Sequence, residues 1–321
     1  MTIYKLGSRG DEVRAIQAKL AALGDYRGPI DGDFGGGTHA AVMAFQRRKG
    51  LDPHGSVQQA TWEALFGSPI PRPAIGNHDL TYRCLALTGS FETGTGVPDC
   101  FCGISGDFDG QGISFGVLQW NFGQGSLQPL LKDMMERHPE VISSIFGADF
   151  DAFAEALNAE KSDLLGFARS VQHPVTHAVF EPWRGFAKTL GRTPQFQKIQ
   201  TEYASGIFRR AIGMCENFGL WSERAVALMF DIVTQNGSIG KVTRAQIMGD
   251  IGALPAGLTD EERETRKMVI VANRRAEAAN PRWIDDVRVR KLCIARGEGI
   301  VHGIPYTLDE QYSIGLRRFA N

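Results

Sequence analysis

The pattern of apolar and polar residues along the chain predicts a mainly helical protein. Apolar residues recur every three or four positions in several windows, which is the spacing of one face of a helix. These windows are residues 11–23, 38–45, 56–66, 126–135, 150–157, 194–214 and 225–233. The last window is apolar all round, which is typical of a buried central helix. Strand-like patterns concentrate in residues 100–120, so we expect one small β lobe within a helical domain.

Helix starts are predicted where a side chain can accept a hydrogen bond from the first backbone N–H groups. Side chains of this kind stand at Asp11, Thr38, Ser56, Thr193, Ser222 and Thr259. Thr259 is followed three positions later by Glu262, which is a capping-box pattern. We therefore expect one more helix, rich in charged residues, that runs from there to residues 280–281.

The helical windows divide between two domains. Residues 1–67 hold three short helical patterns and a loop dense in turn residues, and a proline-rich segment that is typical of a stiff linker follows. A chain of 321 residues is long enough for two domains that each bury a core. We therefore predict a first domain over residues 1–67, a linker over 68–76 and a second domain over 77–321.

The first domain closely resembles the three-helix peptidoglycan-binding module found on many cell-wall hydrolases. The matching pieces are residues 6–13, Ile16 with Gln17, Leu20, residues 31–35, Thr38, residues 44–46, Gly55, Thr61 and Trp62. Most of the apolar residues among them are expected to form the core. The resemblance implies a wall-binding groove near residues 31–38 and the helix that carries Phe45. The residues that it assigns to the groove are Asp31, Asp33, Thr38 and Gln46.

The stretch from residue 89 to residue 121 contains two candidate catalytic acids. Glu92 follows the apolar run 85–87 at the edge of an expected buried helix, whereas Asp109 lies in a glycine-rich turn. Glycoside hydrolysis needs one carboxyl group kept protonated in a dry setting and one kept ionised in a wet setting. The pattern therefore predicts a sugar-cleaving enzyme with Glu92 as general acid and Asp109 as the base that activates water. Asp107 could take the role of Asp109, or it could cap the turn.

Residues after the second acid are candidates for holding water and sugar. Ser114 offers a hydroxyl that could hold the water, within an apolar run expected to be a strand. Gln119, at the end of that run, offers an amide to sugar hydroxyls. Trp120 offers a flat face to a pyranose ring, with core packing as the alternative, and Asn121 is a further binding candidate.

Polar residues also end the apolar window 225–233. Gln235 and Asn236 could cap the end of this helix or place amides in a cleft. Asp231 is a carboxylate within the apolar window, and a buried charge needs hydrogen-bonding or charged partners. We expect Asp231 to be a structural anchor rather than a catalyst.

The motifs around both acids resemble the lysozyme-like superfamily, and within it the chitosanase-type branch. Residues 91–93 (Phe-Glu-Thr) are similar to that branch's acid segment, and residues 109–114 (Asp-Gly-Gln-Gly-Ile-Ser) are similar to its base segment. Gln111 stands where the branch has arginine. Residues 116–119 (Gly-Val-Leu-Gln) resemble an element of lytic transglycosylases. The resemblance implies a mainly α fold class, a three-helix domain followed by a lysozyme-like α+β domain, with the roles given above for the two acids and Ser114.

Charge and hydropathy argue against several other classes. The formal net charge of −1 gives no general attraction to nucleic acid or to anionic membranes. No window approaches the roughly 18 apolar residues of a membrane-spanning helix, and the first ten residues lack the apolar segment of a secretory signal peptide. We expect a monomer that is made in the cytoplasm, spans no membrane and reaches the wall after holin-type release or by secretion.

Metal, cofactor and thiol chemistry are not indicated. The five cysteines are Cys84, Cys100, Cys102, Cys215 and Cys293. They show no paired spacing for zinc, and Cys100 and Cys102 would share one strand face, which is poor disulfide geometry. We expect buried apolar thiols rather than a catalytic cysteine. His173 and His177 are four positions apart, but Pro174 argues against a helix there. No metal site and no cofactor are predicted.

Together these motifs predict an enzyme that degrades the bacterial cell wall. Because the first domain would tether the second to its polymer, peptidoglycan is the expected substrate and partner. The leading hypothesis is a muramidase that hydrolyses the bond between N-acetylmuramic acid and N-acetylglucosamine, in an arrangement that resembles a modular phage endolysin. A secretion-system effector or a bacterial wall hydrolase would have a similar sequence. The alternatives are a lytic transglycosylase on the same bond, a chitosanase, and a non-catalytic wall-binding protein.

Overall fold

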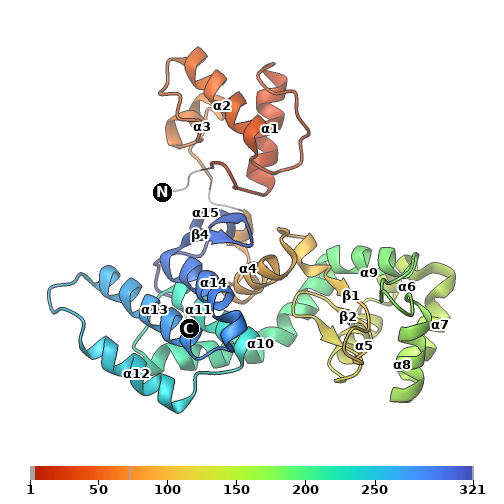
Figure 1. Cartoon of the computed structure of the whole chain (residues 1–321). Helices are drawn as coiled ribbons and strands as arrows, with labels where there is room; N and C mark the ends of the chain where they lie inside the picture. The colour runs from red at the N-terminus through yellow and green to blue at the C-terminus, as the bar shows by residue number, and fades with distance from the viewer. Residues whose placement is uncertain (1–3, 72–73, 320–321) are drawn as a thin grey trace. The chain divides into compact units, whose positions relative to one another are not determined.

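The structure is a computed structural model that describes residues 4–71 and 74–319. It divides into two compact units, the first formed by Met1–Cys84 with Ile207–Asn321 and the second by Leu85–Gly206. Helices dominate the described chain and the strands are short, so the predicted mainly α class with a small β lobe is confirmed (Figure 1). Arg72 and Pro73 of the predicted linker lie outside the described residues, and the domain boundaries stay a prediction.

The first unit contains a three-helix module. Its helices are α1 (Asp11–Ala22), α2 (Gly36–Lys49) and α3 (Gln59–Phe66). Their apolar faces meet in one core, formed by Tyr4, Val13, Ile16, Leu20, Tyr26, Phe34, Ala41, Val42, Phe45, Val57, Trp62 and Leu65. The apolar spacing therefore predicted all three helices and most of the residues that they bury.

The predicted caps of these three helices are wrong. The N-cap positions are held by Gly10, Gly35 and Gln58. Asp11 lies in the first turn of α1 and pairs with Arg14, with 2.7 Å between Oδ1 and Nη1. Thr38 is buried within α2, where its hydroxyl accepts a hydrogen bond from Gln17 at 3.2 Å. Ser56 precedes α3 by a turn and bonds to a neighbouring histidine. Each of the three side chains that we expected to cap a helix is thus hydrogen-bonded or paired to another residue instead.

The remainder of the first unit is mostly helical. Its longer helices are α11 (Glu223–Asn236), α12 (Lys241–Gly252), α13 (Asp260–Glu277) and α14 (Ile284–Arg296). Its short elements are η1 (Ala74–Asn77), η4 (Pro281–Trp283), β4 (Glu298–Val301), β5 (Ile304–Thr307) and α15 (Leu308–Tyr312). Ser222 caps α11 by accepting from the Ala225 N–H, and Thr259 and Glu262 form both bonds of the capping box at α13. Both predicted caps are confirmed.

The hairpin of β4 and β5 was not predicted. Its strands pair antiparallel with Val301 opposite Ile304. The connecting residues, His302 and Gly303, have φ angles of 50° and 80°. A two-residue hairpin turn of this kind needs positive φ at both positions, and Asn-Gly or Asp-Gly is its strongest sequence signal. The His-Gly pair carries that signal only at its second position.

The helix α11 carries a fully buried carboxylate, Asp231, which two cations of α14 hold. Arg290 Nε donates to Oδ1 at 2.8 Å, and Lys291 Nζ donates to Oδ2 at 2.5 Å. Burial alone would raise the pKa of Asp231, but the charges of Arg290 and Lys291 and their hydrogen bonds hold it below its usual range. The predicted structural anchor is confirmed, and its partners lie far along the chain.

The second unit packs helices around a three-stranded lobe. Its helical elements are η2 (Asp99–Phe101), α5 (Leu127–Arg137), α6 (Pro139–Phe146), η3 (Gly147–Asp149), α7 (Phe150–Asn158), α8 (Lys161–Ser170) and α9 (Trp183–Arg192). The chain passes between the units within α4 (Leu80–Thr93) and α10 (Pro194–Asn217). The strands β1 (Ile104–Ser105), β2 (Ser114–Phe115) and β3 (Trp120–Asn121) form an antiparallel sheet in that order. The apolar core of this unit includes Ile113, Phe115, Phe122, Leu130, Phe153 and Phe196.

The expectation that the apolar run over residues 113–120 forms one strand is wrong. Residues 116–119 form a tight turn between β2 and β3, in which Gly116 and Gln119 have φ angles of 88° and 54°. The backbone N–H of Gln119 donates to the carbonyl oxygen of Gly116 at 3.1 Å. The turn resembled a strand because it is itself apolar, with Val117 only 1% exposed.

The cysteines are free and buried, as the sequence predicted. Cys100 lies in η2, a 3-10 helix, so the expectation that it shares a strand face with Cys102 is wrong. Burial raises the pKa of the Cys102 and Cys293 thiols to about 12. A thiol with so high a pKa is not a nucleophile near neutral pH.

Candidate functional site

The sheet of the second unit has one polar face and one apolar face. Ser105 pairs with Ser114, and Ser114 pairs with Asn121. Because directly opposed residues project from the same face, these three polar residues form a row across the lobe. The opposite row, Ile104, Phe115 and Trp120, packs against the core. The Ser114 hydroxyl lies in the middle of the polar row and has no hydrogen-bond partner among the described residues.

The two acids of the glycine-rich turn have different surroundings. Asp107 is 9% exposed, and its Oδ1 accepts from the Gly112 N–H at 2.8 Å while Oδ2 faces Arg169 at 3.4 Å. Asp109 is exposed, and its Oδ1 accepts only from the Gln111 N–H at 3.1 Å within the described chain. Asp107 therefore closes the turn, which was one of its two predicted roles, and Asp109 presents a carboxylate to solvent.

Glu92 is the second-to-last residue of α4 and is exposed. Its neighbour Phe91 is only 1% exposed. The buried face of the helix therefore includes Phe91 but not Glu92. The dry setting that the preceding apolar run predicted for Glu92 is therefore wrong. Glu92 belongs to the same compact unit as Asp109 and Ser114.

The end of α4 that carries Glu92 is held by a very close approach at Gly89. A Cβ atom added to Gly89 would lie 2.2 Å from Val117 Cγ2 and 3.1 Å from the carbonyl oxygen of Cys100. At the next turn of the helix, Thr93 lies beside Gly103, the residue that precedes β1. The helix end is therefore set against the turn between β2 and β3, and this contact positions Glu92 relative to the β lobe.

Replacing Gly89 with alanine is expected to destabilise the protein by about 1–3 kcal/mol, because the added methyl group overpacks a closed contact. Gly166→Ala in α8 is the matched control. Nothing lies within 4 Å of an added Cβ there, so this change should be neutral or stabilising by up to about 1 kcal/mol. Urea denaturation of both variants measures the difference, and equal midpoints for the two would contradict the packing argument.

Glutamine side chains lock the β lobe together. Gln119 accepts from Ser105 Oγ at 2.9 Å and donates to the carbonyl oxygens of Gly103 and Gly116 at 3.0 and 2.9 Å. Both N–H groups of its amide are therefore used within the lobe, and its oxygen already accepts one hydrogen bond. On α10, Gln200 accepts from the Val117 N–H at 2.8 Å. Sequence reasoning missed Gln200 because nothing in the local pattern distinguishes it from a surface glutamine.

The remaining predicted binding residues take structural positions. Trp120 packs on the apolar face of the lobe, which was the alternative considered for it. Asn121 is 7% exposed and accepts from the Gln124 N–H at 2.8 Å. Gln235 belongs to the first unit and accepts from Lys291 Nζ at 2.6 Å. Asn236, in the same unit, keeps a buried Oδ1 with no hydrogen-bond partner among the described residues.

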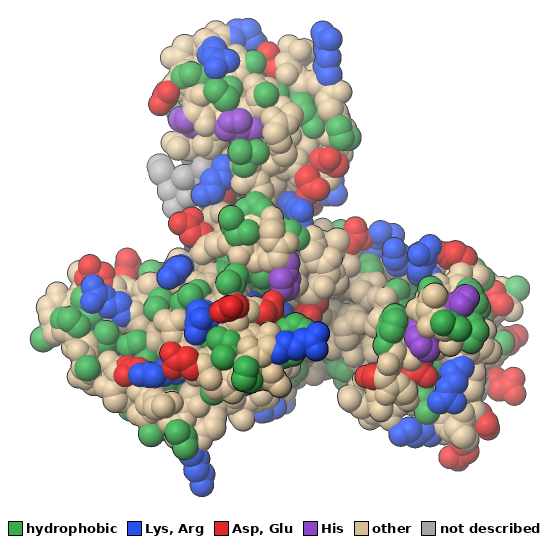
Figure 2. Space-filling model, viewed as in Figure 1, with side chains coloured by type: hydrophobic (Ala, Val, Ile, Leu, Met, Phe, Trp, Pro, Cys, Tyr) green, Lys and Arg blue, Asp and Glu red, His purple; other side chains and the backbone are tan. Residues whose placement is uncertain are grey.

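An exposed aromatic residue stands between the two acids of the turn. Phe108 is 69% exposed, and its ring makes a T-shaped contact with the ring of His177, with 5.1 Å between ring centroids. Val175 and Phe180 are also exposed in the loop that carries His177. Figure 2 shows histidine and hydrophobic side chains next to one another on the visible face of this unit. Sequence reasoning missed this aromatic surface, although a phenylalanine between two aspartates in a turn was a signal for it.

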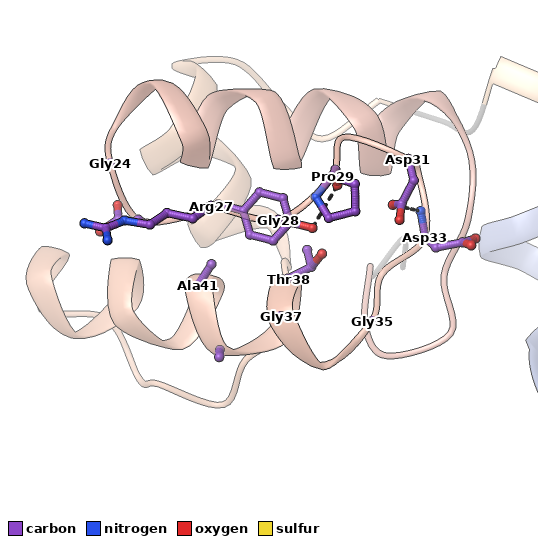
Figure 3. A pocket seen from close by; sticks show the side chains of 13 residues that line it. Gly24, Arg27, Gly28, Pro29, Asp31, Asp33, Gly35, Gly37, Thr38 and Ala41 are labelled. Carbon is purple, nitrogen blue, oxygen red and sulfur yellow. Dashed lines mark hydrogen bonds between the residues drawn. The ribbon is translucent and has the colours of Figure 1, made fainter.

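The three-helix module has a groove of about 580 Å³ between α2 and the loop that precedes it. Of the four residues predicted to line a wall-binding groove, Asp31, Asp33 and Thr38 do so. Figure 3 shows these three residues together with Arg27 and Gly37 around it. The groove lies where the resemblance to the wall-binding module places one.

The fourth predicted residue, Gln46, is fully buried and has a structural role. Its amide donates to the carbonyl oxygen of Ser56 at 2.8 Å and accepts from the Gly55 N–H at 2.9 Å. Gln17 on α1 has the equivalent role at the groove, where it donates to Asp31 Oδ1 and accepts from the Gly32 N–H, both at 2.8 Å. Each glutamine thus holds one loop of the module in place.

Metal-ligand clusters and membrane-spanning helices are both absent from the described residues. Within residues 4–71 and 74–319, no group of three or more histidine, cysteine, aspartate and glutamate side chains could hold a metal ion. No helix in the same ranges is long and apolar enough to cross a membrane.

Comparison with known proteins identifies the module. Residues 9–65 match the family described as "Putative peptidoglycan binding domain", which confirms the resemblance found in the sequence. The N-acetylmuramoyl-L-alanine amidase CwlM of Mycobacterium tuberculosis is 39% identical over 74 residues, which cover 20% of this chain and 18% of that protein. The spore cortex-lytic enzyme of Oceanobacillus iheyensis is 40% identical over 63 residues, with 20% and 23% covered. The chain thus spans about a fifth of the length of these two curated relatives.

Solved structures similar to this chain include two chitosanases. A GH46 chitosanase of Gynuella sunshinyii, in complex with chitotetraose, has a TM-score of 0.39 and 13% identity, over 68% of this chain and 86% of that one. The native chitosanase of Bacillus subtilis MY002 has a TM-score of 0.42 and 18% identity, over 69% and 87%.

Proposed function

We propose that this protein is a peptidoglycan glycan-strand hydrolase of the muramidase type, in which the three-helix module binds the wall. The observation that carries the proposal is the joining, in one chain, of a module that matches a peptidoglycan-binding family with a unit in which both candidate acids, Glu92 and Asp109, are exposed. The alternative candidate for the base, Asp107, is already engaged by the Gly112 N–H and faces Arg169.

In the proposed reaction, Glu92 donates its proton to the glycosidic oxygen between N-acetylmuramic acid and N-acetylglucosamine as the bond to the anomeric carbon breaks. Asp109 accepts a proton from a water molecule whose oxygen bonds to that carbon. The Ser114 hydroxyl, which lies in the polar row of the β lobe, holds this water. Because Glu92 is exposed, the bound glycan itself must exclude solvent from the acid.

The exposed ring of Phe108 supports a place for sugar next to Asp109. A phenylalanine that is 69% exposed offers an apolar face on which the carbon-bound hydrogens of a pyranose can pack. In this proposal Phe108 takes the role that the sequence assigned to Trp120. The wall-binding module raises the local concentration of glycan around this weakly enclosed site.

The mass of the released fragments distinguishes the proposed hydrolysis from its alternatives. Wild-type protein on purified peptidoglycan is expected to release fragments with reducing-end sugars. Fragments lighter by one water would assign a lytic transglycosylase instead. Cleavage of a glucosamine polymer with none of the wall would assign a chitosanase, and binding without any cleavage would assign a non-catalytic wall-binding protein.

The order of module and catalytic unit in this chain resembles that of a modular phage endolysin, and we propose that the protein acts as a monomer on the wall after release or secretion. A secretion-system effector and a bacterial wall hydrolase remain the alternative settings. Lysis of cells by protein added from outside, compared with lysis by protein expressed inside together with a membrane-permeabilising agent, tests whether access to the wall needs such a release step.

Asp109→Asn is expected to lower the rate of reducing-end release by about 10²-fold or more, because the water loses its base. Asp99→Asn is the matched control, because Asp99 is an exposed acid of the same unit that pairs with Arg192 at 2.7 Å. The control should keep wild-type activity, and both variants should keep the wild-type unfolding midpoint. Near-normal activity of Asp109→Asn would argue against a hydrolytic base and favour the transglycosylase.

A further inference from the structure

The groove of the three-helix module carries opposite charges at its two ends. Figure 3 shows Arg27 at one end and Asp31 with Asp33 at the other, with Thr38 between them. Arg27 is exposed and has no ion-pair or hydrogen-bond partner among the described residues. A neighbouring acid, Asp25, is already paired with Arg48, so the charge of Arg27 is not offset within the groove.

The acidic end of the groove keeps one carboxylate that forms no ion pair in the described chain. Asp33 is paired with Arg9, with 2.9 Å between Oδ1 and Nε. Asp31 accepts hydrogen bonds from Gln17 Nε2 at 2.8 Å and from the Asp33 N–H at 2.9 Å, and no cation lies within ion-pair distance of it in the described chain. The Gln17 hydrogen bond, followed by that of the Asp33 backbone, holds the pKa of Asp31 below its usual range. Asp31 is therefore ionised and held in place at neutral pH.

The space between these ends suits an extended backbone better than a sugar ring. The lining residues on α2 are small, namely Gly37, Thr38, Ala40 and Ala41. The one aromatic side chain among the lining residues, Tyr26, is 8% exposed, and its hydroxyl donates to the carbonyl oxygen of Pro29 at 2.9 Å. The groove therefore lacks the exposed ring on which a pyranose would stack, whereas its small side chains allow the main chain of a peptide to approach.

We propose that this groove binds the peptide part of peptidoglycan, the uncross-linked stem peptide, with the ammonium group of its diamino acid against Asp31 and its terminal carboxylate against Arg27. The inference rests on the proposed wall-binding function of the module and deepens it. An uncross-linked stem carries both of these charges, whereas a cross-link consumes the ammonium group. The module would therefore direct the enzyme to parts of the wall with few cross-links.

The test uses the whole chain and synthetic acetyl-L-Ala-γ-D-Glu-L-Lys-D-Ala, whose affinity is measured by isothermal titration calorimetry. Acetylating the lysine ammonium is expected to weaken binding to the wild type by about 10-fold, the effect of losing one charge-assisted hydrogen bond. Acetylating the ammonium should not further weaken the binding of the peptide to the Asp31→Asn variant. Amidating the terminal carboxylate should likewise weaken binding to the wild type and have no further effect on Arg27→Gln.

The control is Asp52→Asn, which removes an exposed acid of the module that does not line the groove, and it should bind all three peptides as the wild type does. Equal affinity of the wild type for the free and acetylated peptides would overturn the inference. Binding to sacculi is measured as well, because it shows whether only the peptide ligand is wrong or the proposed wall-binding function is wrong too. Binding to intact sacculi and equally to sacculi stripped of their peptides would reject the peptide ligand and keep the wall-binding function. No binding to sacculi at all would reject both.

Discussion

Replacing Glu92 with glutamine is expected to lower the rate of reducing-end release from purified peptidoglycan by about 10²–10⁴-fold, the contribution that a general acid typically makes. Glutamine keeps the size of the side chain but has no proton of suitable acidity to donate to the leaving oxygen. Because Glu92 is exposed at the end of α4, the change should leave the unfolding midpoint as it is. Mass spectrometry of the released fragments measures the rate and the chemistry together.

Two comparisons make the Glu92 experiment decisive. Glu155→Gln changes an exposed glutamate on α7 of the same unit and should keep wild-type activity. Binding of Glu92→Gln to sacculi should equal that of the wild type, because the groove that we propose to bind the wall belongs to the three-helix module. Equal fragment release by Glu92→Gln and the wild type would remove Glu92 from the reaction and, with it, the proposed enzyme mechanism.

Asp231→Asn is expected to lower the free energy of unfolding by about 3–5 kcal/mol, because it leaves Arg290 and Lys291 buried without their counter-charge. The three side chains are almost completely buried, with exposures between 0% and 2%. No water can therefore replace the lost carboxylate without opening the contact between α11 and α14. The free energy follows from urea denaturation of the variant and the wild type.

The control for this prediction is Asp250→Asn, which removes the partner of Arg274 at 2.6 Å in a pair whose side chains are 32% and 37% exposed. Solvent screens such a pair, so the midpoint should stay close to that of the wild type. If the unfolding midpoint of Asp231→Asn shifts as little as that of the control, the buried group of Asp231, Arg290 and Lys291 contributes little to the free energy of unfolding.

The contribution of Asp231 also depends on pH in a defined direction. Its pKa in the folded protein is lowered, so its stabilising effect is fully present above the unfolded value of about 3.9 and is lost as the pH falls through the folded-state pKa. The difference in stability between wild type and Asp231→Asn should therefore shrink below about pH 4. A difference that grows in acid would contradict the lowered pKa.

Local patterns predicted a large part of the fold. The helices α1, α2, α3, α5, α7, α10 and α11 all lie where the apolar spacing predicted helices. This succeeds because the spacing of apolar residues is a property of residues that are neighbours in the sequence. The turn between β2 and β3 was mistaken for a strand, since a buried turn and a buried strand are equally apolar.

The sequence by itself determined the helical class, the wall-binding module and the acids on which the proposed chemistry depends. Only the tertiary structure decided which polar side chains are available. Asp107 and Asp109 are two residues apart, yet contacts with Arg169 on α8 and with the rest of the turn engage one and leave the other exposed. Gln119 and Gln46 were candidates for binding and are both used by backbone groups. Most of the partners of these two glutamines lie 9 to 16 residues away in the chain. The pattern of immediately neighbouring residues therefore does not predict the bonds.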